Sequence, residues 1–233
     1  MENELNMNLS LSGKSSTIIR LIGCVILMLM SGCGKKNNKQ LAKTYYKLCM
    51  VELGEGLSTD VAIRKALDYV DKAIDCDPKP EYQAVRGSIL FKLKHYNRSI
   101  ACFKTALREI TCPRIRGELL NNIACIYGQQ GNCRKAHAIW TKLLTSPHYL
   151  TPEVAMVNLA KMFVDKGKYD QAKKYCAKAV THAPTYIDAH FYLALLSYYT
   201  QDFSLAKKEV ATTLFMEPGH QGAKHLERML AVS

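Results

Sequence analysis

The chain has 233 residues, of which 48% are hydrophobic and 22% are charged. This length and balance fit one folded domain or one repeat array, and they exclude a chain too polar to bury a core. The formal net charge of +12 suits anionic lipid, acidic protein or nucleic acid as a partner. Because the basic residues are scattered along the chain rather than clustered, we expect no nucleic-acid partner.

The first 33 residues carry the pattern of an export signal. Lys14 and Arg20 lead into a ten-residue apolar run over 21–30, and small residues and Cys33 follow. Ten helical residues rise about 15 Å, half of a hydrocarbon core of about 30 Å, so this run is too short for a good transmembrane span. We therefore predict a signal peptide over residues 1–32. Translation from Met7 instead of Met1 would leave that run intact, and both starts stay open.

The end of this leader, Met30-Ser31-Gly32-Cys33, resembles the bacterial lipobox. The resemblance implies that the Cys33 thiol is acylated and that Cys33 becomes the mature N-terminus; an uncleaved anchor or a chance cysteine is the alternative. Residues 33–40 are then a lipidated tether, polar and rich in lysine. Gly34 stands where an Asp would favour the inner membrane. We therefore expect a lipid-anchored protein of the bacterial cell envelope, on the outer membrane and facing the periplasm.

Residues 153–186 form the clearest of several repeats of about 34 residues. Small residues recur at positions 8, 20 and 27 of this unit, where helices can approach closely, and larger residues recur at 4, 7, 11, 17 and 24. Gly167 lies between two helical segments, and Pro184 ends the second. Similar units begin near 47, 80, 117 and 187, and residues 220–231 follow as a cap helix.

These units resemble the tetratricopeptide repeat. The resemblance implies an all-α fold over residues 41–233, a superhelical solenoid of about five helix-turn-helix repeats with a C-terminal cap helix. In such arrays the first helix of each repeat lines a concave groove, where an Asn can hydrogen-bond an extended peptide. The matching residues are Asn122 and Asn158. In the last unit the groove positions carry Phe191, Tyr192, Leu195, Tyr198 and Tyr199, which either anchor a partner or pack against the cap.

No motif for catalysis or metal binding is found in the sequence, which has neither H-E-x-x-H nor C-x-x-C. We therefore expect no catalytic residue, no metal and no cofactor. Apart from Cys24 and Cys33, seven cysteines remain: Cys49, Cys76, Cys102, Cys112, Cys125, Cys133 and Cys176. In an oxidising compartment they are either buried and inert or bridged, within or between chains, and both alternatives stay open.

A lipoprotein built from tetratricopeptide repeats resembles the pilotins of type IV pili, which help a secretin ring to assemble in the outer membrane. Residues 119–131 are similar to the third repeat of that family, and residues 148–162 to the linker and helix that follow. Pilotins usually have six repeats, whereas this chain shows five. The resemblance implies a non-catalytic scaffold for a secretin. A general envelope adaptor for proteases or cell-wall enzymes is the alternative, and a peptidoglycan-active or redox enzyme is the third hypothesis.

Overall fold

A computed structural model describes residues 38–54 and 59–231 of the chain. The predicted signal peptide, Cys33 and Met7 lie outside these ranges. The described residues form helices and turns without a β-strand, and they divide into two compact units, Met1–Ile89 and Leu90–Ser233. None of the helices within these ranges combines the length and the apolarity needed to cross a membrane.

The first unit contains a helix over residues 38–54, α2 (Asp60–Cys76) and most of α3 (Pro80–Lys92). Thr59 caps α2 by accepting a hydrogen bond from the backbone N–H of Ala62 at 3.2 Å. One face of α2 is buried, at the helical spacing of Ile63, Ala66, Val70 and Ala73. The helix over 38–54 includes residues 38–40, which the sequence placed in the tether, and it begins nine residues before the unit start expected near 47.

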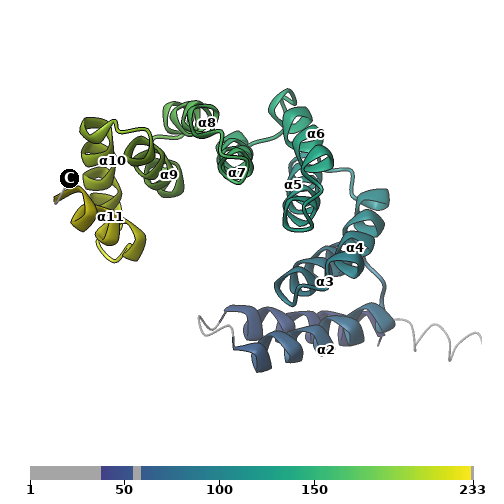
Figure 1. The fold of residues 1–233 in the computed structure, drawn as a ribbon. Helices are drawn as coiled ribbons and strands as arrows, with labels where there is room; N and C mark the ends of the chain where they lie inside the picture. The colour runs from purple at the N-terminus through teal and green to yellow at the C-terminus, as the bar shows by residue number, and fades with distance from the viewer. Residues whose placement is uncertain (1–37, 55–58, 232–233) are drawn as a thin grey trace, which may run out of the picture. The chain divides into compact units, whose positions relative to one another are not determined.

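The second unit continues from the end of α3 through eight further helices, which are α4 (Tyr96–Glu109), α5 (Pro113–Gln129), α6 (Cys133–Leu144), α7 (Pro152–Val164), α8 (Tyr169–His182), α9 (Ile187–Tyr199), α10 (Phe203–Met216) and α11 (Gln221–Ala231). Three antiparallel hairpins, α5–α6, α7–α8 and α9–α10, follow one another, and α11 packs on α9 and α10 (Figure 1). In addition, α5 contacts α7 and α7 contacts α9, so the first helices of successive hairpins lie side by side. The predicted all-α repeat solenoid with a cap helix is thereby confirmed.

The turns inside the hairpins repeat one hydrogen-bond pattern. The backbone N–H of His95, Asn132, Lys168 and Asp202 each donates to the carbonyl five residues earlier, at 2.8–2.9 Å. This is the bond of a Schellman motif, which needs a left-handed residue beside it. Gly131 and Gly167 supply that residue with φ of 73° and 68°, and Lys94 and Gln201 adopt it with φ of 60°. All four stand at position 15 of the units beginning at 80, 117, 153 and 187.

Small residues hold the hairpins together at the expected positions. The following are fully buried at positions 8 and 20 of their units: Ala124, Ala136, Ala160, Ala172, Ala194 and Ala206. Larger side chains such as Trp140, Leu159 and Phe103 fill the space between the helices. Because the described helices contact only those of their own hairpin and of the next one, the core consists of local clusters along the array.

One pair of ionisable side chains is buried between α9 and α10. The Nδ1 atom of His190 lies 2.5 Å from Oε2 of Glu209, and its Nε2 lies 2.9 Å from the carbonyl oxygen of Pro184. The two residues are only 5% and 4% exposed. Both ring nitrogens therefore face an oxygen, which fixes the imidazole in one orientation.

Candidate protein-binding groove

A groove of about 270 Å³ lies along the first helices of two neighbouring hairpins. We call it the α5–α7 groove. Its walls come from α5, α6 and α7 and from the end of α3, and its lining residues are Phe91, Cys125, Gly128, Gln129, Cys133, Trp140, Asn158, Lys161, Met162 and Asp165. Five of these residues, Cys125, Gln129, Asn158, Lys161 and Asp165, occupy positions 6, 9 or 13 of their units. The cavity thus lies on the face where tetratricopeptide arrays bind peptides.

Asn158 lies in the groove as predicted, but its side chain is already engaged. Its Nδ2 donates to Oδ1 of Asn121 at 3.1 Å and to Sγ of Cys125 at 3.4 Å. The same Asn121 oxygen accepts from the indole Nε1 of Trp140 at 2.9 Å. This network ties α5, α6 and α7 together. The amide oxygen of Asn158 is the atom that these three hydrogen bonds leave for another partner.

Asn122, the other predicted asparagine, is half-buried on α5 and does not line the α5–α7 groove. The preceding residue in the sequence, Asn121, accepts hydrogen bonds from both Trp140 and Asn158. Asn122 as a peptide-binding residue therefore stays a prediction, whereas Asn121 joins three helices through its hydrogen bonds. The signal that could have found Asn121 is its spacing from Trp140, since a buried indole N–H requires an acceptor.

Lys161 places a cation in the middle of the groove, and sequence reasoning did not select it. Its Nζ lies 4.4 Å from the centroid of the Tyr192 ring, a cation–π distance. Among the described residues no carboxylate forms an ion pair with it. Asp165 lies one helical turn further along α7 and is exposed. A half-buried ammonium of this kind can bind the carbonyl or carboxylate oxygen of a partner.

The aromatic stripe predicted on α9 does not form one surface. Phe191 contacts the cap, with its ring 4.5 Å from that of His220, and Leu195 and Tyr198 pack on the cluster that contains Leu226. Tyr192 turns the other way, toward Lys161.

Tyr199 is 54% exposed, and it stacks on Tyr169 with ring centroids 5.5 Å apart. Of the five predicted residues on α9, Tyr192 and Tyr199 are therefore the two directed away from the cap. Of these two, Tyr192 is the one that contacts a groove-lining residue, Lys161.

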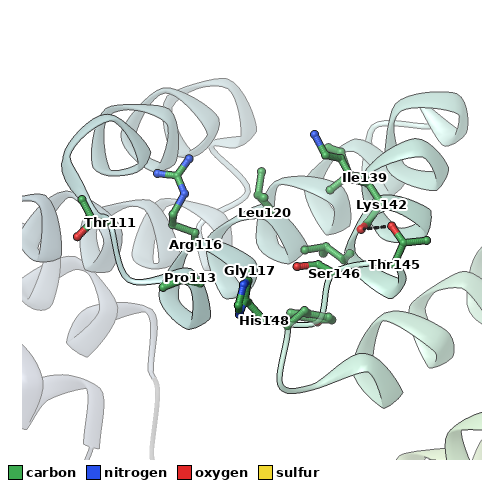
Figure 2. A pocket seen from close by; sticks show the side chains of 12 residues that line it. Thr111, Pro113, Arg116, Gly117, Leu120, Ile139, Lys142, Thr145, Ser146 and His148 are labelled. Carbon is green, nitrogen blue, oxygen red and sulfur yellow. Dashed lines mark hydrogen bonds between the residues drawn. The ribbon is translucent and has the colours of Figure 1, made fainter.

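A larger cavity of about 680 Å³ opens between the α4–α5 turn and α6 (Figure 2). Arg116 stands on one side of it, and Ile139 and Lys142 stand on the other, with Leu120 between them (Figure 2). The Arg116 side chain has a structural role, because its Nη1 donates hydrogen bonds to the carbonyl oxygens of Leu107 and Ile110 at 2.6 and 2.7 Å. Apolar and polar side chains share the remaining wall, and no acidic residue lines it.

The seven cysteines of the described residues are free thiols. Cys49, Cys102 and Cys176 are buried, Cys112 is exposed, and the other three are half-buried. Burial raises the pKa of Cys125 to about 11, although the nearby charge of Lys161 opposes the shift. Burial likewise raises the pKa of Cys176 to about 12. Both thiols therefore stay protonated at neutral pH, which makes them poor nucleophiles and poor metal ligands.

Residues 38–54 and 59–231 hold no group of three or more His, Cys, Asp or Glu side chains that could bind a metal ion. The chemistry that the groove does offer is recognition. It presents an ammonium, a free amide oxygen, an exposed carboxylate and aromatic walls, all on rigid helices.

Comparison with known proteins agrees with this geometry. Two segments, residues 80–109 and 154–186, match the tetratricopeptide repeat. A search of curated proteins found no match to the chain. Among solved structures, the chain resembles pilF of Pseudomonas aeruginosa, with a TM-score of 0.66 and 17% identity over 84% of this chain and 85% of that one.

Two further solved structures are similar. PilW, described as a widely conserved type IV pilus biogenesis factor, gives a TM-score of 0.60 and 20% identity over 83% of this chain and 94% of that one. YrrB, described as a tetratricopeptide-repeat protein with an unusual peptide-binding site, gives 0.50 and 18% identity over 83% and 95%.

The hairpin array and these matches together show that the chain has the tetratricopeptide-repeat fold, a scaffold for protein–protein interaction. Within that class it resembles the type IV pilus proteins pilF and PilW.

Proposed function

We propose that this chain is a non-catalytic, membrane-anchored scaffold that binds a protein partner in the α5–α7 groove. The observation that carries the proposal is Lys161, a half-buried cation without a carboxylate partner among the described residues, set between two rigid helices. An extended peptide that crosses these helices would place a backbone carbonyl or an acidic side chain against Lys161. The amide oxygen of Asn158 and the Tyr192 ring would complete the contact.

The membrane anchor in this proposal is acyl lipid on Cys33. Three features of the sequence support it, namely the basic leader, the apolar run of ten residues and the Ser-Gly-Cys end. Acylation there would hold the repeat array at the periplasmic face of the outer membrane. The partner would then be another protein of the cell envelope.

The partner favoured here is a secretin or another component of a type IV pilus. The similarity to pilF and PilW supports this choice, together with the order of lipobox, short tether and repeat array. The peptide-binding site named for YrrB supports the use of a groove by this fold. A general adaptor for envelope proteases or cell-wall enzymes is the second candidate. It is favoured by the five repeats counted in the sequence, one fewer than pilotins usually have.

Affinity purification of the tagged, full-length protein from crosslinked cells tests the proposal. The groove variant is Lys161→Glu, and the matched control is Lys135→Glu on α6, whose ammonium also lies over a tyrosine ring, at 5.2 Å from that of Tyr127. We expect one dominant envelope protein to be lost in the groove variant and retained in the control. A secretin as that protein supports the pilotin role, whereas proteases or cell-wall enzymes support the general adaptor. A partner retained by both variants contradicts binding in this groove.

A further inference from the structure

The helix over residues 38–54 leaves an apolar flank exposed. Leu41 is 42% exposed, Leu48 is 40% exposed and Val51 is 54% exposed. Their spacings of seven and three residues put them along one side of the helix. Ala42 and Cys49, each about a quarter-turn round the helix from the preceding leucine, are fully buried in the first unit. An exposed row of large apolar residues indicates a surface that interacts with something else.

Three lysines run along the other flank of the same outward surface. Lys39, Lys43 and Lys47 recur every four residues, and all three are exposed. Within the described residues none of them forms an ion pair with a carboxylate. Glu52 is the single acidic residue of the helix. The outward surface therefore carries Leu41, Leu48 and Val51 along one flank and the three lysines, with the exposed Met50 among them, along the other. Apolar and cationic residues on one exposed helix surface are the pattern of helices that lie in a membrane interface.

The distance from Cys33 restricts what this helix can meet. Residue 38 is five positions after Cys33, so even a fully extended chain spans at most about 18 Å between them. If Cys33 carries lipid, the helix begins within that distance of the bilayer surface. The headgroup layers add about 10–15 Å to the hydrocarbon core, divided between its two sides. A bilayer would then lie within reach of the N-terminal end of this helix.

We propose that the outward surface of helix 38–54 binds an anionic phospholipid bilayer. Leu41, Leu48 and Val51 enter the boundary between headgroups and acyl chains, and the lysine flank binds lipid phosphates. A second copy of the chain fits less well, because two lysine flanks would repel each other. This inference rests on the proposed acylation of Cys33. It adds a second membrane contact that fixes how the first unit meets the bilayer.

Quenching by brominated lipid tests the contact. The full-length protein is purified from cell membranes, and acylation of Cys33 is measured by mass spectrometry. It is then reconstituted into vesicles of phosphatidylglycerol and phosphatidylethanolamine with brominated acyl chains. The chain has one native tryptophan, Trp140, which is 3% exposed and serves as the unquenched reference. The variant Leu48→Trp adds a second tryptophan on the apolar flank.

We expect the added tryptophan to be quenched in anionic vesicles, and the quenching to fall by about half or more in high salt or in phosphatidylcholine vesicles. The same loss is expected when the three lysines of the flank are replaced by glutamine. The matched control replaces three exposed lysines of the second unit, Lys174, Lys178 and Lys207, with glutamine. It should leave the quenching unchanged.

Two outcomes overturn the inference, and they differ in what they say about the anchor. Acylated protein whose added tryptophan is not quenched shows that the helix stays off the bilayer, while the proposed anchor stands. Equal losses in the two glutamine variants also refute a specific lysine flank. Protein that is not acylated at Cys33 refutes the proposed anchor itself, and the short-tether argument falls with it.

Discussion

Replacing either of two glycines on α5 by alanine should have opposite effects on stability. A Cβ atom at Gly117 would lie 2.6 Å from Cδ2 of Tyr149, whose ring is only 6% exposed. A Cβ atom at Gly128 would lie 3.5 Å from Cη2 of Trp140, an ordinary contact distance. The two substitutions are chemically identical and lie in one helix, so each is the control for the other.

The expected magnitudes follow from two competing effects. Alanine in place of glycine favours a helix by about 1 kcal/mol. At Gly117 the buried ring must move to accommodate the methyl group, and such overpacking costs about 1–3 kcal/mol. We therefore expect Gly117→Ala to lower the free energy of unfolding by about 1 kcal/mol. Gly128→Ala should raise it by about 0.5–1 kcal/mol.

Urea unfolding followed by Trp140 fluorescence measures this difference. Trp140 is the single tryptophan of the chain and packs in the cluster that contains Tyr149. It therefore reports on this hairpin even if distant repeats unfold separately. A Gly117→Ala protein as stable as the Gly128→Ala protein would refute the reasoning, because the close approach of Tyr149 would then have no cost.

Three further predictions concern α9 and α10. His190→Ala should lower the free energy of unfolding by about 3–5 kcal/mol in urea titrations, because it leaves the buried Glu209 carboxylate without its partner. Gln201→Gly should raise the free energy of unfolding by about 1 kcal/mol, because glycine adopts the left-handed conformation of this position without the steric cost of a Cβ atom. An unchanged urea midpoint would contradict this. Hydrogen bonds from Lys173 and from a backbone N–H hold the pKa of Asp202 below its usual value. These hydrogen bonds stabilise the folded protein fully above the usual pKa of an aspartate. The stabilisation is lost as the pH falls through the lowered pKa of Asp202. Asp202→Asn should therefore be less stable than wild type at pH 7, and the gap should close in acid.

Most of the fold could be predicted because each repeat carries its own signals. The units expected at 80, 153 and 187 coincide with the starts of α3, α7 and α9 to within one residue. Left-handed residues at position 15 confirm the same register, including Lys94 and Gln201, where no glycine marked the turn. The third unit was placed near 117, whereas α5 begins at Pro113, a proline that fits the first position of a helix.

The start of the array was harder to predict because its first helix departs from the repeat pattern. Matches at positions 7, 8 and 11 set the unit start near 47. The structure continues the same helix back to residue 38, through Ala42 and the half-buried Tyr45 and Tyr46.

The candidate site was predicted only in part, since contacts across helices decide which side chains stay available. Asn158 lines the groove that the structure shows, but its hydrogen bond to Asn121 could not be foreseen from spacing along one helix. The aromatic residues of α9 were also found. Because α9 is apolar on several sides, the sequence could not show which side the cap would cover. Lys161 was overlooked because a single lysine on a helix is usually solvated, and its position over Tyr192 depends on two hairpins.

Site-specific photocrosslinking in cells tests the central claim most directly. Benzoylphenylalanine is placed at Asp165, which is exposed and lines the α5–α7 groove, and in a second strain at Lys135, which is exposed on α6 outside it. The account predicts that one envelope protein crosslinks at position 165 and not at 135, and that Lys161→Glu abolishes the crosslink. Crosslinking to the same protein at both positions, or at 135 alone, would contradict a partner held in the groove.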